Sequence, residues 1–145
     1  MTVNLSELWL QYASDDLRSA KILLAEGVYN IACFHSQQAV EKLFKALIAA
    51  YDQPIPRTHN LIRLHKICEG LLGDKIETDD EKLILLNDVY IDSRYPADFG
   101  VLPSGQPGER EAKMTYSHAR EIDTVLRPLV EDRINPSSMS KDDFA

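Results

Sequence analysis

The chain has 145 residues and a formal net charge of −7 at pH 7. This length suits one domain, and the acidic balance excludes a general nucleic-acid coat protein, which needs a broad excess of Lys and Arg. No apolar run approaches the roughly 18 to 20 residues that cross a bilayer, and the N-terminus lacks the pattern of a signal peptide. We therefore expect a cytoplasmic protein without a membrane segment, in which Cys33 and Cys68 are free thiols on apolar helix faces.

The first helix is predicted to begin near Asn4 or Ser6, either of which can cap it, and to end at Ala25 or Glu26. Gly27 suits the left-handed residue that follows a helix. Because so few residues separate this helix from the next, the two should form an antiparallel hairpin. The side chains predicted to be buried recur at helical spacing: Trp9, Ala13, Leu17, Ala20 and Leu24.

The central helix is predicted over residues 31–51 and should end before Pro54. One stripe of it is apolar and predicted to be core: Cys33, Val40, Phe44, Leu47 and Tyr51. The opposite stripe is polar and mostly cationic: His35, Gln38, Lys42 and Lys45. Gln37 and Glu41 lie on the boundary between these stripes. Because a half-buried amide left unpaired costs about 1 to 3 kcal/mol, we expect Gln37 and Gln38 to have hydrogen-bond partners.

Two further helices are predicted before a long loop. Thr58 should cap a third helix, which Gly73 ends. Thr78 and Glu81 have the spacing of a capping box, which predicts the start of a fourth helix that ends near residues 93–94.

Residues 95–108 carry three prolines and three glycines, so they are predicted to form a long loop, a frequent location of functional residues. A last helix is predicted from Glu109 to Asp132, with a kink or an early end at Pro128.

The whole pattern predicts an all-α domain over residues 1–133, followed by a flexible tail over residues 134–145. No segment has the alternation of a strand, and the sequence has neither a Gly-rich phosphate loop nor a metal-spaced Cys/His cluster. We therefore expect neither a bound metal nor a cofactor.

Short motifs add to this periodicity. In chain order they are Asp16-Leu17, Gly27-Val28-Tyr29-Asn30-Ile31-Ala32, Phe34-His35-Ser36-Gln37-Gln38-Ala39-Val40-Glu41-Lys42, Lys45-Ala46, Thr58-His59-Asn60-Leu61 and Ser93-Arg94-Tyr95-Pro96. In this combination the chain resembles the HEPN domain family over roughly residues 5–130.

The resemblance implies a bundle of four long helices plus a shorter one, usually a homodimer. The wide apolar face predicted for the fourth helix also favours a homodimer. In prokaryotes such proteins are often encoded beside a minimal nucleotidyltransferase, as a toxin-antitoxin-like module of two genes. The resemblance thus implies an interaction protein that binds a nucleotide or RNA and acts with a nucleotidyltransferase partner.

Many family members are metal-independent RNA endonucleases that use an Arg and a His separated by four to six residues. Here the positions at which that His would follow Arg94 are occupied by Phe-Gly-Val at residues 99–101, none of which can transfer a proton. The chain thus resembles the Arg-Tyr-Pro branch of the family, for which nucleotide binding has been proposed. The alternative is an endonuclease with a rearranged site, in which His59 or His118 replaces the missing His.

Arg94 and Tyr95 are the first candidate ligand residues, because an arginine fork beside an aromatic ring can hold a phosphate and a base. An equal alternative is that Arg94 interacts with the negative end of the helix dipole. His59 can be a general base or a phosphate contact, although a hydrogen bond to backbone at a helix N-terminus is the simpler interpretation.

The remaining candidates are Arg63, Gln37, Gln38, Lys42 and Lys45. For the two lysines the simpler interpretation is a solvated helix face, unless the basic segment 57–66 folds beside them. The glutamines either support Arg94 or the third helix, or lie in a dimer interface. His118 is most simply an exposed helix residue.

Overall fold

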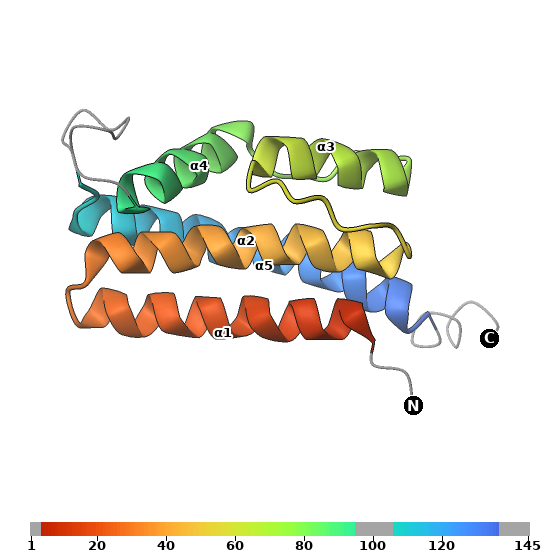
Figure 1. Ribbon diagram of the computed structural model, residues 1–145, viewed down its shortest axis with the longest axis horizontal. Coiled ribbons are helices and arrows are strands. Elements are labelled where there is room, and N and C mark those ends of the chain that lie inside the picture. The colour runs from red at the N-terminus through yellow and green to blue at the C-terminus, as the bar shows by residue number, and fades with distance from the viewer. Residues whose placement is uncertain (1–3, 95–105, 137–145) are drawn as a thin grey trace.

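The computed structural model describes residues 4–94 and 106–136. These residues contain helices and no strand, which confirms the all-α prediction: α1 (Leu5–Ala25), α2 (Tyr29–Ala50), α3 (Leu61–Leu72), α4 (Asp80–Arg94) and α5 (Glu109–Ile134). Figure 1 shows α1 and α2 as an antiparallel pair, with α5 behind them and with α3 and α4 following one another along the opposite side of α2. Because α2 contacts each of the other four helices, it is the central element of the bundle.

The ends of α1 follow from its flanking residues. The Asn4 side chain accepts a hydrogen bond from the Ser6 backbone N–H at 3.0 Å, as expected of an N-cap. Gly27 has a φ of 77°, in the left-handed region that glycine adopts without steric cost. The turn is so short that α2 begins at Tyr29, two residues before its predicted start.

Two predicted caps are wrong by one or two residues. Asn60, not Thr58, caps α3, and its Oδ1 accepts from two backbone N–H groups of the first turn. At α4 the Asp79 side chain accepts from the Glu81 N–H at 3.0 Å, so Thr78 is not the capping residue. In both places Asn or Asp follows a threonine, by two residues at Asn60 and by one at Asp79, and is at least as good a cap.

The helix α5 continues past Pro128 to Ile134, so of the kink or early end predicted at this proline the early end does not occur. Proline removes one backbone donor from a helix. Leu126 and Val130, on either side of it, are both fully buried in the core, and this packing keeps the helix continuous. The last turn includes Ile134, which was predicted to belong to the tail, and residues 137–145 of that tail lie outside the described part.

The core is built around α2, whose Phe44 and Leu47 are fully buried as predicted. On α1, Ala13 and Ala20 are fully buried, while Trp9 and the other predicted stripe residues are partly buried. Within the described ranges, no helix combines the length and apolar character that a membrane span requires. An unusual feature of α2 is that its buried side also carries polar side chains: Ser36, Gln37, Glu41 and Lys45.

Candidate functional site

A buried ion pair lies in the middle of α2. Glu41 and Lys45 have side chains that are 5 % and 7 % exposed, and Lys45 Nζ donates to Glu41 Oε2 at 2.9 Å. Two charges can be enclosed in this way when they are paired with each other. The prediction that Lys45 lies on a solvated face is therefore wrong, and its Nζ is instead 5.9 Å from the centre of the Trp9 ring.

His59 lies on the other oxygen of the same carboxylate. Its Nδ1 is 2.8 Å from Glu41 Oε1, so the segment before α3 does fold beside α2. The expected bond from His59 to backbone is wrong, because its ring has a carboxylate partner. The side chain is 53 % exposed, and with Nδ1 occupied the nitrogen available to a ligand is Nε2. A histidine oriented in this way can contact a phosphate or act as a general base.

The two adjacent glutamines hold this arrangement in place. Gln37 is fully buried, and its Nε2 donates to the His59 backbone carbonyl at 3.1 Å. Gln38 Nε2 in turn donates to Gln37 Oε1 at 2.8 Å. The prediction that both amides have partners is confirmed. As a result α2 fixes both the backbone and the ring of His59.

A second carboxylate cluster joins α1 to α2, and sequence reasoning missed it as a site. Asp16 is buried, His35 Nδ1 lies 2.8 Å from its Oδ1, and Lys42 Nζ donates to its Oδ2 at 2.5 Å. Lys42 is therefore an ion-pair partner and not a free surface charge. The signal was present in the sequence, because Asp16 falls at helical spacing between Ala13 and Ala20, both predicted to be core.

Aromatic rings connect the two clusters. Phe34 contacts the edge of His35, with ring centres 5.3 Å apart, and stacks on Tyr90 of α4 at 5.8 Å. Tyr90 in turn lies 5.5 Å from His59. We call these four rings, from His35 through Phe34 and Tyr90 to His59, the ring row. A cavity of about 290 Å³ adjoins its His59 end and is lined by His59, Asn60, Asn87, Tyr90 and Ile91.

The structure describes only part of the candidate residues at the end of α4. Arg94 is the last residue of this helix and follows Tyr90 by four positions, so the two occupy one face of α4 one turn apart. The Arg94 side chain and all of Tyr95 lie outside the described residues. Arg63 is exposed in the first turn of α3, which begins directly after the His59–Asn60 turn.

His118 is not the exposed residue that was predicted. It is partly buried on α5, and its Nδ1 is enclosed without a hydrogen-bond partner in the described part of the chain. Burial, followed by the charge of Lys82, lowers the pKa of His118. No contact seen among the described residues connects it to Glu41.

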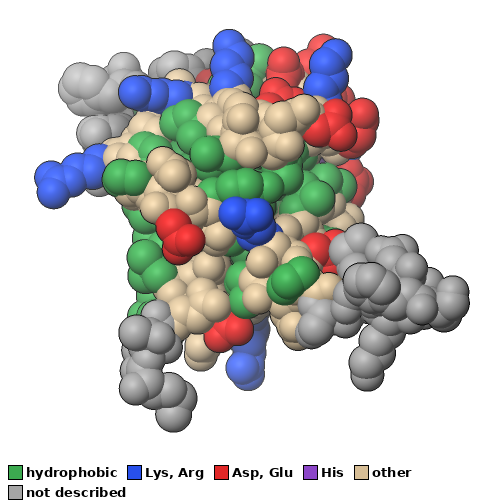
Figure 2. Space-filling view, turned by 90° about the vertical axis from the view of Figure 1, so that its right-hand side faces the viewer, with side chains coloured by type: hydrophobic (Ala, Val, Ile, Leu, Met, Phe, Trp, Pro, Cys, Tyr) green, Lys and Arg blue, Asp and Glu red, His purple; other side chains and the backbone are tan. Residues whose placement is uncertain are grey.

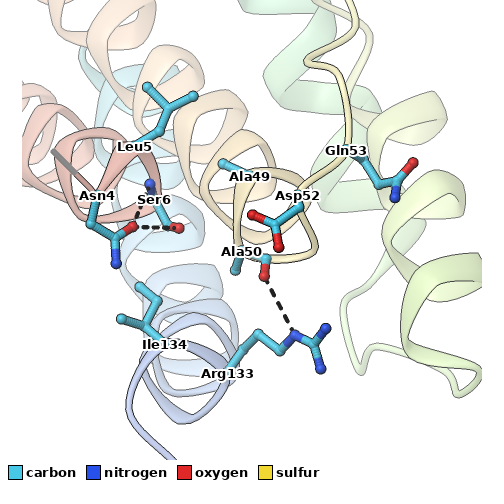
Figure 3. A pocket seen from close by; sticks show the side chains of 9 residues that line it. All are labelled: Asn4, Leu5, Ser6, Ala49, Ala50, Asp52, Gln53, Arg133 and Ile134. Carbon is cyan, nitrogen blue, oxygen red and sulfur yellow. Dashed lines mark hydrogen bonds between the residues drawn. The ribbon is translucent and has the colours of Figure 1, made fainter. Parts of the chain in front are cut away.

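A second cavity, of about 640 Å³, opens at the end of the bundle where α1 begins and α2 and α5 end (Figure 3). Arg133 lies at its edge, with Nε donating to the Ala50 carbonyl at 3.4 Å and the guanidinium 4.0 Å from the centre of the Tyr51 ring. Figure 2 views this end, where hydrophobic side chains gather in the middle and acidic ones toward the upper right edge. The residues that line this cavity include no histidine. His35 and His59 therefore belong to the clusters on α2 and not to this cavity.

The donor set of the Glu41 and Asp16 clusters does not suit a metal. Among residues 4–94 and 106–136 no group of three or more His, Cys, Asp and Glu side chains could hold a metal ion. Each of these carboxylates is instead surrounded by nitrogen donors. The arrangement can accordingly bind an anion, stack a base or move a proton at a histidine Nε2.

Comparisons with known proteins agree with this architecture. The family model described as the HEPN domain matches residues 6–129. The Methanocaldococcus jannaschii protein named "Putative toxin MJ1304" is 28% identical over 141 residues, which is 90% of this chain and 91% of that protein.

Two crystal structures have the same fold. TT1696 from Thermus thermophilus aligns with a TM-score of 0.67 and 28% identity, over 90% of this chain and 99% of that one. ST0689, described as an archaeal HEPN homologue, aligns with a TM-score of 0.63 and 24% identity, over 86% of this chain and 97% of its own.

Proposed function

Because this chain belongs to the HEPN domain family, we propose that it binds a nucleotide or RNA and acts in a toxin-antitoxin-like module. The observation that carries the proposal is the half-exposed His59, held on Glu41 beside the ring of Tyr90. A histidine beside an aromatic ring supports the binding of a phosphate together with a stacked base.

The charges of the cluster support an anionic ligand. Lys45 already balances the carboxylate of Glu41, so this ion pair has no net negative charge that would repel an anionic ligand at His59. Arg63 lies in the first turn of the next helix, and Arg94 lies one helical turn beyond Tyr90. An arginine adds a planar fork that suits a phosphate.

The module and its partners are inferred from relatives. A protein 28% identical to this chain carries the name "Putative toxin MJ1304", and the family resemblance implies a minimal nucleotidyltransferase as the second component. A homodimer is part of the same proposal. Ile84 and Ile91 of α4 are exposed, and they would be covered in a second copy that packs on this helix.

A second function, metal-independent RNA cleavage, is favoured by one observation. The Nδ1 of His59 is held by a buried carboxylate, as it is in a histidine that serves as a general base. In this reading His59 replaces the histidine that the sequence lacks after Arg94. The two functions differ in turnover, because only an endonuclease converts a labelled RNA to shorter products.

Titration calorimetry with AMP, ATP and a short RNA tests the binding proposal. In His59→Asn the amide nitrogen can take the place of Nδ1 on Glu41 while the Nε2 contact is lost, so the fold should persist and binding should fall. Arg94→Ala and Arg94→Lys should both fold normally and bind poorly, because the lysine lacks the planar fork. Arg120→Ala removes an exposed cation from α5 and serves as the matched control.

Unchanged binding by His59→Asn and by both Arg94 variants would place the ligand elsewhere and refute the proposal. The partner and dimer are tested separately, by inspecting the neighbouring genes for a nucleotidyltransferase that co-purifies with this chain and by sedimentation at tens of micromolar. A monomer at that concentration, or no neighbouring nucleotidyltransferase gene, would contradict those two parts.

A further inference from the structure

The Asp16 cluster repeats the chemistry of the Glu41 cluster. Each has one nearly buried carboxylate, and in each one carboxylate oxygen accepts from a lysine Nζ while the other lies on a histidine Nδ1. Asp16 is 9 % and Glu41 5 % exposed, whereas His35 is 27 % exposed and reaches the surface. In both histidines the carboxylate therefore takes Nδ1, and Nε2 is the ring nitrogen that remains for a ligand.

The two histidines are the ends of the ring row. His35 contacts Phe34, Phe34 stacks on Tyr90 with ring planes 18° apart, and Tyr90 contacts His59. Both aromatic rings are partly exposed. An aromatic pair between two potential cations matches a ligand that has an apolar, stackable group between two anionic groups.

We propose that His35 is a second anion contact on the surface that contains His59, and that the ligand is a strand with phosphates on both sides of an unpaired base. This inference rests on the proposed binding function. As at His59, the lysine balances the carboxylate, so the ion pair has no net negative charge that would repel a phosphate at His35. The base lies on the Phe34–Tyr90 pair, and Tyr90 also lines the cavity of about 290 Å³ at the His59 end of the ring row.

The arrangement selects against a mononucleotide. All the phosphates of ATP leave from one side of its ribose, so one molecule cannot place phosphates at both ends of the ring row with its base between them. A dinucleotide with a 5′-phosphate has two phosphates separated by a nucleoside, which is the order of groups that the ring row requires. The ligand class is therefore defined by the separation of its phosphates and not by their number.

The test compares AMP, ATP and the dinucleotide pApA on the full chain by calorimetry at one fixed, low ionic strength. The wild-type protein should bind pApA roughly tenfold more tightly than AMP, as expected for one added charge-assisted contact at an exposed position. His35→Asn, which keeps a donor for Asp16, should lose that advantage and leave AMP binding unchanged. Arg120→Ala again serves as the charge control, and thermal melts verify that each variant folds.

The two proposals fail in different ways. If AMP binds through His59 but pApA is no tighter, or if His35→Asn leaves the pApA advantage intact, the second contact is refuted and the binding function stands. If ATP exceeds AMP in affinity by as much as pApA does, and His35→Asn removes that difference, the site binds one polyphosphate. That result would refute the proposal that the ligand is a strand. If no probe binds and His59→Asn changes nothing, the binding function itself is refuted.

Discussion

Replacing Glu41 with leucine would leave Lys45 enclosed without its ion-pair partner. The Lys45 side chain is 7 % exposed, and the carboxylate 2.9 Å away is the acid with which it is paired. Among the described contacts its ammonium would then have the face of Trp9, 5.9 Å away, as its remaining electrostatic partner. The ring of His59 loses the same carboxylate, but its exposure lets water replace that contact.

Removing one partner of a buried ion pair costs about 3 to 5 kcal/mol. A domain of this size has a free energy of unfolding of about 5 to 15 kcal/mol, so the loss is a large fraction of the total. At about 2 to 4 °C per kcal/mol, the melting temperature should fall by roughly 10 °C. The double variant Glu41→Leu with Lys45→Met removes both charges and fills the space with apolar atoms. It should recover most or all of the loss, because apolar replacement of a buried pair is often neutral or stabilising.

Urea unfolding followed by circular dichroism measures all three free energies. Glu109→Leu is the matched control, since Glu109 also pairs with a lysine four residues later but both side chains are more than half exposed. This control should change the free energy of unfolding by less than about 1 kcal/mol. A loss below about 1 kcal/mol in Glu41→Leu, or a double variant no more stable than the single one, would refute the reasoning.

The thiols of Cys33 and Cys68 should react with a disulfide reagent at pH 8 only after denaturant is added, because burial raises their pKa values to about 11 and about 12; fast labelling of the native protein would contradict this. Burial lowers the pKa of His118 in the folded protein. As the pH falls below the ordinary value of 6.5, the unfolded chain therefore binds a proton on this histidine before the folded protein does, and the free energy of unfolding decreases. Unfolding titrations from pH 7.5 to 5 should therefore show a decline in stability that is smaller in His118→Gln; equal declines would exclude this cause. Asn60→Ala should reduce the free energy of unfolding by about 0.5 to 2 kcal/mol, since it removes the N-cap of α3; Thr58→Ala is the control and should cost less.

The sequence was sufficient to predict the helices, because their signals are local. Apolar side chains recur with the helical period, and Asn4, Gly27 and Gly73 stand where a helix starts or stops. Local signals also explain the errors, since a threonine one or two residues before Asp79 or Asn60 has nearly the same capping chemistry. Pro128 is a local signal that tertiary packing overrides.

The tertiary structure decided how the polar side chains are paired. Glu41 meets His59 from 18 residues away, and Asp16 meets Lys42 from 26 residues away. A helical period shows that Lys45 lies on a polar stripe, but not that its ammonium lies near Trp9 of α1 or that His59 reaches Glu41. Pairing of this kind depends on the relative positions of whole helices, which only the packing of the core around α2 determines.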